Sequence, residues 1–450
     1  MSLNRPTPIY TLVFLRIALG LLGGGDILGN GIYYHWYLDS FSGFTFRYYG
    51  FEWVQPLPEP LLSAFFIVGF LLGICVAIGY RFRLTAPLFA LCFTYLFLLE
   101  KAHYLNHAYL FAWLAWLLWL TPAWREWSVD VWRRPAERWT VAPAWAVYLF
   151  PALMGVVYFF GGINKINYDW LIEAMPLHMW LQARSEMPVL GPLFAQKTTA
   201  YVMAWGGMLL DLTAPFLLLH RRGRWVALGL LLFFHATNHL IFNIGIFPYL
   251  SLVLTSLFFR PDWPRLFVEW VAGRSARVRG WTVKWQGRGD GNVETQNFAS
   301  LHFPVLLIAL LAIIHLYLPL RHHLFATDVN WTEEGHRYSW RMMLRSKQGR
   351  GYYRLVDLDT GAAEQVSPRD SLNAKQYRKM VTHPDMILQY AHHLRDVRAD
   401  AGQRVAVYGR FKVRLNGRKD QTFIDPDIDL GQVEWDWLAV KPWVLPERAR

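Results

Sequence analysis

A long apolar run leads into a lysine in the stretch PAWAVYLFPALMGVVYFFGGINKINYDW, residues 143–170. Its apolar part, 143–163, has the length of one membrane-spanning helix, about 17–25 residues. Lys165, Asp169 and Trp170 follow almost directly. The lysine either marks the end of a membrane helix and reaches into water, or is a base kept in a dry pocket. The other polar residues near this boundary have to distinguish the two interpretations.

The composition is that of a membrane protein. Of the 450 residues 54% are hydrophobic and only 17% are charged, whereas soluble domains carry about 25% charged residues. Apolar runs of spanning length recur, so the sequence predicts a polytopic α-helical membrane protein with about nine spans. The third, fourth and eighth runs are short, and the eighth follows the seventh so closely that this pair is expected to form a broken or re-entrant helix. The runs are 10–28, 61–79, 84–99, 105–120, 143–163, 199–219, 225–241, 244–259 and 301–320.

Arginine and lysine gather in every second loop. By the positive-inside rule, this puts the N-terminus in the cytoplasm and, with an odd number of spans, the C-terminal tail outside. The net charge of +12 is then largely a consequence of topology, and no nucleic-acid partner is expected. The basic loops hold Arg5, Arg81, Arg83, Arg125, Arg133, Arg134, Arg138, Arg221, Arg222, Arg224, Arg260, Arg265, Arg274, Arg277, Arg279, Lys284 and Arg288, and the opposite loops hold Arg47, Lys101, Lys165, Arg184 and Lys197.

The chain changes composition after residue 320. Residues 1–320 are expected to form a helical transmembrane catalytic domain, and residues 321–450 an extracytoplasmic α+β domain of a typical domain size. Alternating apolar residues and turn signals predict the elements of this tail. They are strands at 352–359 and 404–415, a turn at Asn416-Gly417 and a helix at 383–398.

Several polar side chains are predicted at membrane depth, where an unpaired polar group is costly. For Arg16 and Asp26 an ion pair to a neighbouring helix is the favoured interpretation, and for Asp211 a structural pair and a functional role are equally open. The topology places Lys165 on the same outer side as Asn106 and the 235–243 end of the seventh run. Because burial favours the neutral amine, a lysine in such a pocket can act as a base or form a Schiff base.

Two histidine pairs have the i, i+4 spacing of a shared metal site on a helix, His103/His107 and His235/His239. This spacing suggests a membrane di-iron oxygenase or desaturase as a rival function. Such enzymes also need adjacent histidines preceded by a third, and the adjacent pairs in this chain lack it. No metal site is therefore expected.

The segment GGINKINYDW resembles the lysine-bearing motif of the vitamin K-dependent gamma-glutamyl carboxylases. The similarity continues in order along the chain, from the membrane segments into the tail. Because several independent motifs match, chance similarity is very unlikely. The other similar segments are LEKAHYLNHAYL, WGGMLLDL, FFHATNHLIFNIGIFPY, NWTEEGHRYSWRMM, HPDMILQYA and IDPDIDL.

The resemblance implies a role for each of six residues, and helix geometry adds Tyr158, which is expected two turns before Lys165 on the same helix face. Lys165 would be the catalytic base, with His107 as a second catalytic residue that contacts the hydroquinone beside Asn106. The remaining cofactor-binding positions would be Tyr158, Trp170, His235 and Asn238. For Tyr158, ordinary packing is an equally good interpretation.

The resemblance also implies a reaction. A deprotonated naphthohydroquinone, reduced vitamin K or menaquinone, reacts with O2 to give a strong alkoxide base and finally an epoxide. That base removes the γ-proton of a glutamate in an exported peptide, and CO2 adds. The alternatives are quinol oxygenation without carboxylation and a non-enzymatic membrane scaffold with a peptide-binding tail.

The expected surroundings are a lipid bilayer that supplies an isoprenoid quinone. Cys75 and Cys92 both fall inside apolar runs, so the tail is expected to have no disulfide. Together with the compact length, this favours the bacterial cytoplasmic (inner) membrane with the tail outside, or the ER membrane if the source is eukaryotic.

Overall fold

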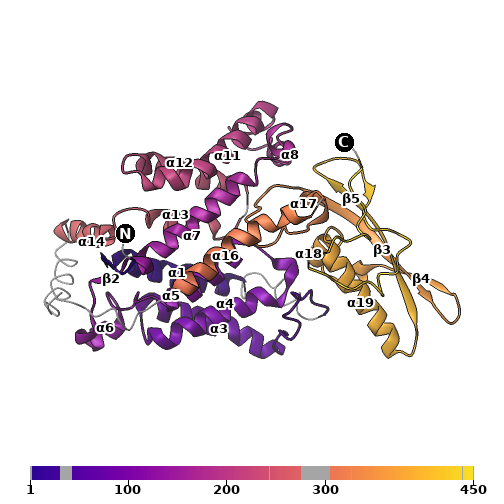
Figure 1. Cartoon of the computed structure of the whole chain (residues 1–450), viewed down its shortest axis with the longest axis horizontal. Helices are drawn as coiled ribbons and strands as arrows, with labels where there is room; N and C mark the ends of the chain where they lie inside the picture. The colour runs from indigo at the N-terminus through magenta and orange to yellow at the C-terminus, as the bar shows by residue number, and fades with distance from the viewer. Residues whose placement is uncertain are drawn as a thin grey trace.

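The computed structural model describes residues 3–30, 43–242, 244–274, 305–325, 327–437 and 439–448. A bundle of helices is followed by an α+β region, which confirms the predicted fold class (Figure 1). Part of the predicted ninth run, 301–304, lies outside the described residues. The same holds for four residues of the predicted basic loops, Arg277, Arg279, Lys284 and Arg288.

A helix occurs in each of the nine predicted apolar runs. Among the described residues, six helices are long and apolar enough to cross a membrane. The third run, expected to be short, is one of them, because its helix has 18 residues. The nine helices are α1 (Tyr10–Leu28), α3 (Glu59–Ile78), α4 (Phe82–Leu99), α5 (Asn106–Trp119), α7 (Ala144–Ile163), α11 (Lys197–Leu219), α12 (Gly223–Ile241), α13 (Phe247–Ser256) and α16 (Val305–Leu320).

Shorter elements connect these helices. They are β1 (Pro6–Pro8), a 3₁₀ turn at Lys101–His103, α6 (Val129–Arg133), β2 (Val141–Pro143), α8 (Tyr168–Leu171), α9 (Leu177–Gln182), α10 (Gly191–Phe194), α14 (Trp263–Arg274), a 3₁₀ turn at Arg321–Leu324 and α17 (Val329–Thr332). Strands β1 and β2 pair antiparallel and hold the N-terminus against the start of α7.

Helices α1 and α3 approach closely because glycines face one another. A Cβ added to Gly73 would lie 2.6 Å from the backbone oxygen of Gly20 and 2.8 Å from the Cα of Gly24. Membrane helices commonly pack through such small residues. This contact fixes α1, whose residues Gly25 and Asp26 line the cavity described below.

Arg16 on α1 is held by backbone carbonyls. Its guanidinium donates to the carbonyl oxygens of Ala123 (3.1 Å), Glu126 (3.2 Å) and Trp127 (2.6 Å). Over the described ranges no carboxylate lies within ion-pair distance of it, so the expected ion pair to a neighbouring helix is wrong. The carbonyls are free because they belong to the loop before α6, not to a helix.

The seventh and eighth runs form a broken helix, as expected. α12 ends at Ile241, α13 begins at Phe247, and Gly245 between them has a φ of +59°. The 10 residues of α13 extend about 15 Å, half of the roughly 30 Å hydrocarbon thickness of a bilayer.

The two ends of the molecule differ. The N-terminus, α6 and α14 lie at one end of the bundle, and the α+β region lies at the other (Figure 1). Described residues of the arginine-rich loops, such as Arg133 and Arg265, are therefore far from the tail. This arrangement is what the positive-inside expectation requires.

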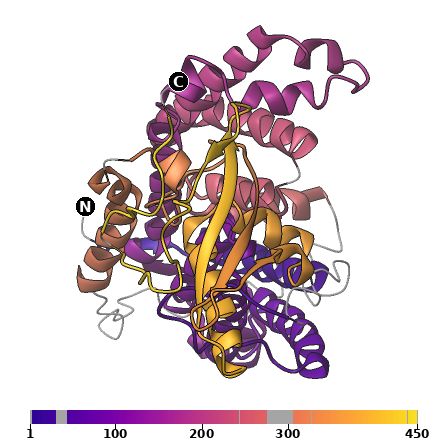
Figure 2. The same cartoon turned by 90° about the vertical axis from the view of Figure 1, so that its right-hand side faces the viewer.

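The tail is built on an antiparallel sheet of strand order β4-β3-β5-β6. Two helices lie between this sheet and the bundle (Figures 1 and 2). The predicted strands, helix and Asn416-Gly417 turn are all present. The elements are β3 (Lys347–Asp357), β4 (Ala363–Val366), α18 (Ala374–Met380), α19 (Pro384–Asp400), β5 (Val405–Leu415) and β6 (Gln421–Thr422).

The tail is tied to the bundle by buried polar contacts. Lys101, beyond the end of α4, forms an ion pair of 2.7 Å with Asp385 of α19. Gln376 of α18 donates to the Glu100 carboxylate at 2.8 Å. These contacts hold the tail over the ends of the helices near Lys101, where tail residues line the cavity described below.

Candidate active site

A cavity of about 1280 Å³ runs from the interior of the bundle to the tail. Its walls come from α1, α4, α5, α7, α11, α12 and α13 and, at the other end, from residues 336–345 and α18. All seven residues predicted for the site line this one cavity: Asn106, His107, Tyr158, Lys165, Trp170, His235 and Asn238. Their individual roles stay predictions.

Lys165 does not reach into water. It follows the C-terminus of α7 and is only 6% exposed. Its Nζ donates to Asp211 Oδ2 at 2.5 Å and to the Gly161 carbonyl oxygen at 3.1 Å, and lies 5.9 Å from the centre of the Trp170 ring. The interpretation of Lys165 as a membrane-end lysine that extends into solvent is therefore wrong, and Asp211 is its ion-pair partner.

Asn106 and His107 begin α5. The Asn106 side chain accepts from the Tyr104 hydroxyl at 2.8 Å and donates to the Arg341 carbonyl oxygen at 3.1 Å, so its amide is held in one orientation. The His107 ring stacks 5.8 Å from Phe247 of α13. A Cβ added to Gly245 would lie 3.8 Å from His107 Nε2, so the break between α12 and α13 packs beside this imidazole.

Tyr158 and His235 form a second polar pair on the cavity wall. The Tyr158 hydroxyl lies 3.3 Å from His235 Nε2 and 2.9 Å from the Thr255 hydroxyl. His235 Nδ1 is buried and has no hydrogen-bond partner among the residues that the structure describes. Asn238, on the same helix, is half-buried at the cavity wall. A ligand in the cavity can therefore meet several polar atoms within mostly apolar walls.

Trp170 lies beside the Lys165 side chain. Its indole nitrogen donates to the Ala204 carbonyl oxygen of α11 at 2.9 Å, and its backbone amide donates to the Asn167 side chain at 3.0 Å. Asn167 thereby caps the short helix α8. The rigid α8 holds the indole ring against the Lys165 side chain.

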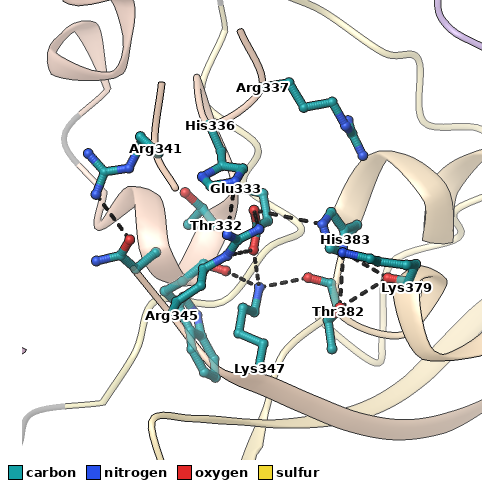
Figure 3. Close-up of polar contacts among 12 residues, drawn as sticks. Thr332, Glu333, His336, Arg337, Arg341, Arg345, Lys347, Lys379, Thr382 and His383 are labelled. Carbon is teal, nitrogen blue, oxygen red and sulfur yellow. Dashed lines mark hydrogen bonds and ion pairs between the residues drawn. The ribbon is translucent and has the colours of Figure 1, made fainter. Parts of the chain in front are cut away.

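The tail end of the cavity is strongly cationic, which the sequence did not predict (Figure 3). The Arg345 guanidinium grips the Glu333 carboxylate through two nitrogens, and Lys347 Nζ lies 3.2 Å from the same carboxylate. The cationic end is formed by two segments, residues 333–347 and α18 with the residues after it. The groups that line the cavity here are His336, Arg337, Arg341, Arg345, Lys375, Arg378, Lys379 and His383.

Charge and burial shift the pKa values at this end. Burial raises the pKa of Glu333, but the charges of Arg345 and Lys347 outweigh it and hold that pKa well below its usual range. Burial lowers the pKa of the Lys379 amine to about 8, with a contribution from Arg345. Burial likewise lowers the pKa of Lys375 to about 8. Two carboxylates pair with cations here, Glu333 with Arg345 and Asp385 with Arg337. The other arginine and lysine side chains that line the cavity leave this end with an excess of positive charge.

The segment that carries these cations has unusual backbone geometry. Glu333, Tyr338, Trp340 and Met343 all have φ between +55° and +65°. Each such non-glycine residue costs of order 1–3 kcal/mol unless its surroundings hold it. Strain of this kind concentrates at functional sites, which supports a functional role for the segment.

Two families of known proteins match the chain. The HTTM domain matches residues 4–263, and the vitamin K-dependent gamma-carboxylase lumenal domain matches residues 301–450. The chain belongs to the vitamin K-dependent gamma-carboxylase family. It is thus a multi-pass membrane protein of the gamma-carboxylase type. No solved structure matches the chain.

The two histidine pairs with i, i+4 spacing in this carboxylase-family protein are not arranged as pairs of metal ligands. His103 lies in a 3₁₀ turn while His107 belongs to α5, because Leu105 between them is extended. His235 is buried, whereas His239 is exposed. Across the described part of the chain, no group of three or more His, Cys, Asp or Glu residues could hold a metal ion.

A sequence signal for the cationic end did exist. Arg337, Arg341 and Arg345 recur every four residues, with Lys347 close behind. The family resemblance covered part of this segment, but nothing local indicates that it returns to the membrane cavity. That placement depends on the contact between the tail and the outer ends of the helices.

Proposed function

We propose that the protein oxygenates a reduced naphthoquinone with Lys165 as base and couples this to carboxylation of a glutamate in an exported peptide. The observation that supports the proposal is the cavity itself. One continuous space joins a buried lysine and its polar neighbours to a cationic end.

The residues of the inner end fit a naphthohydroquinone. Its rings and isoprenoid tail require apolar walls, and its two oxygens require polar partners. Asn106, His107 and His235 Nδ1, which has no hydrogen-bond partner within the described ranges, supply such partners. When bound, the hydroquinone would supply with O2 the strong base that removes a γ-proton from glutamate.

In this proposal Lys165 enters the reaction as the neutral amine and accepts the hydroquinone proton. Asp211 Oδ2, 2.5 Å from Nζ, stabilises the ammonium that results. Because the pair is buried, its attraction is screened little by water. His107 lies in the first turn of α5, where the positive end of the helix dipole favours a developing negative charge.

The cationic end binds the peptide glutamate in this proposal. A carboxylate is the group that arginine and lysine side chains recognise best. Arg345, Lys379 and Lys375 line the cavity, and the Lys379 side chain is open to it. A glutamate held there would lie in the same cavity as the inner end, and CO2 would add at its γ-carbon after the proton is removed.

The remaining expectations complete the proposal. The catalytic helical part would comprise residues 1–320, and the α+β part, residues 321–450, would lie outside the bacterial cytoplasmic membrane, where exported peptides pass. Cys75 and Cys92 are free, which suits a tail without disulfides. Menaquinone would be the natural quinone there.

The test uses the purified full chain in detergent with vitamin K hydroquinone, O2, labelled bicarbonate and a glutamate-rich peptide. A peptide with glutamine at every glutamate position is the matched control. Epoxide together with label in the glutamate peptide alone is the expected result. Epoxide without label would mean oxygenation alone, and neither product from a folded, quinone-binding sample would favour the scaffold alternative.

A further inference from the structure

The turn between β5 and β6 reaches back to the loop that follows Lys165. The Asn416 side-chain amide donates to Asp169 Oδ2 at 2.6 Å, and its oxygen accepts from the Ser346 backbone amide at 2.9 Å. The Asn416 backbone amide also donates to the Ser346 carbonyl oxygen at 2.8 Å. A single buried side chain, 4% exposed, thus links two segments that lie far apart in the sequence.

Each linked segment serves one end of the cavity. Asp169 precedes Trp170, whose ring faces Lys165 Nζ. Ser346 stands between Arg345 and Lys347, which form the cationic end (Figure 3). Asn416 therefore connects the lysine loop to the cations, beside a direct hydrogen bond of 2.9 Å from Arg341 to the side chain of Asn164.

The turn is suited to this contact. Asn416 has a φ of +49° and Gly417 a φ of +78°, which asparagine and glycine tolerate best. A Cβ on Gly417 would lie 3.2 Å from the Met179 sulfur of α9, so the turn also packs against the bundle. Arg418 adds a second contact, because its guanidinium pairs with Asp169 Oδ1.

We propose that Asn416 is a positioning residue that sets the separation of the lysine end and the cationic end. This rests on the proposed function, in which a base generated at one end must meet a glutamate held at the other. A misplacement of about 1 Å between reacting groups costs on the order of a hundredfold in rate. The contacts of Asn416 with Asp169 and Ser346 are called the bridge below. Loss of the bridge therefore lowers carboxylation more than epoxide formation.

Three variants isolate the bridge. Asn416→Gly keeps the left-handed turn and removes both side-chain contacts. Asn416→Asp keeps the acceptor for Ser346 but sets two carboxylates against each other at Asp169. The double exchange Asp169→Asn with Asn416→Asp restores a donor and an acceptor in reversed order. Asp420→Asn, which breaks an outer ion pair with Arg350 near the same turn, is the control.

The measurements are the ratio of carboxyglutamate to epoxide and the hydrogen exchange of residues 166–175 and 344–348. We expect Asn416→Gly and Asn416→Asp to lower the ratio about tenfold or more, and to speed exchange in both segments. The double exchange should recover both readouts in part, because it restores the Asn416 contacts but gives up the ion pair of Arg418 with Asp169. Asp420→Asn should change neither readout.

If Asn416→Gly and Asn416→Asp change neither the ratio of carboxyglutamate to epoxide nor the hydrogen exchange, the bridge is refuted. If they speed hydrogen exchange but leave the ratio unchanged, the positioning role is refuted. A parallel fall of both products without recovery by the double exchange would mean a structural role only, which also overturns the proposal. If the wild type forms no epoxide, the proposed function fails, while unchanged exchange in Asn416→Gly would still refute the bridge by itself.

Discussion

Replacement of Lys165 separates its chemical role from its structural one. The lysine and Asp211 side chains are 7% and 5% exposed and lie 2.5 Å apart. Lys165→Ala leaves the Asp211 carboxylate buried without its partner, which costs about 3–5 kcal/mol of folding free energy. It also removes a base, and general-base catalysis contributes about 10²–10⁴-fold in rate. The single variant should therefore lose both stability and epoxide formation.

The double variant Lys165→Met with Asp211→Leu resolves these effects. Replacing a buried ion pair by apolar side chains of similar volume is often neutral or stabilising, so its thermal midpoint in detergent should return close to that of the wild type. Its rate of epoxide formation, measured by chromatography, should stay at least about a hundredfold low. Lys197→Met, which removes an exposed lysine at the start of α11, is the control.

The result that refutes this reasoning is specific. If the stable double variant forms epoxide at a rate near that of the wild type, Lys165 is not the base. If Lys165→Ala is as stable as the wild type, the Lys165–Asp211 pair does not contribute to the fold as its burial indicates.

Three further predictions concern other parts of the cavity. Tyr158→Phe removes a hydroxyl bonded to Thr255, so unfolding free energy should fall by about 1 kcal/mol; a calorimetric midpoint above that of the wild type would contradict this. Because the Lys379 and Lys375 pKa values are about 8, their charge is lost as pH rises through that value, so fluorescence titrations should show weaker glutamate-peptide binding from about pH 7 to about pH 9. Glu333 has a lowered pKa, so its charge stabilises the fold above its unfolded pKa of about 4.3, and this stability is lost as pH falls. The unfolding free energy of Glu333→Gln should therefore be about 3–5 kcal/mol below that of the wild type near neutral pH. This difference in unfolding free energy should become smaller in acid, and a difference that does not change with pH would refute the argument.

Short-range patterns accounted for the elements. A helix in each of the nine apolar runs, the break between α12 and α13 and the β5 strand with its turn at Asn416 follow from hydropathy and turn chemistry, which depend on neighbours a few residues away. The i, i+4 spacing of His103 and His107 does not place both rings on one helix face, because the extended backbone at Leu105 starts α5 only at Asn106.

The sequence by itself determined the membrane class, the family and the residues around Lys165, because these are written in composition and contiguous motifs. Only the tertiary structure decided which groups meet. Asp211 pairs with a lysine 46 residues away, Arg16 finds carbonyls rather than a carboxylate, and Arg345 and Lys379 converge at the cavity. Such contacts depend on how helices rotate and how the tail docks, and no local periodicity encodes either.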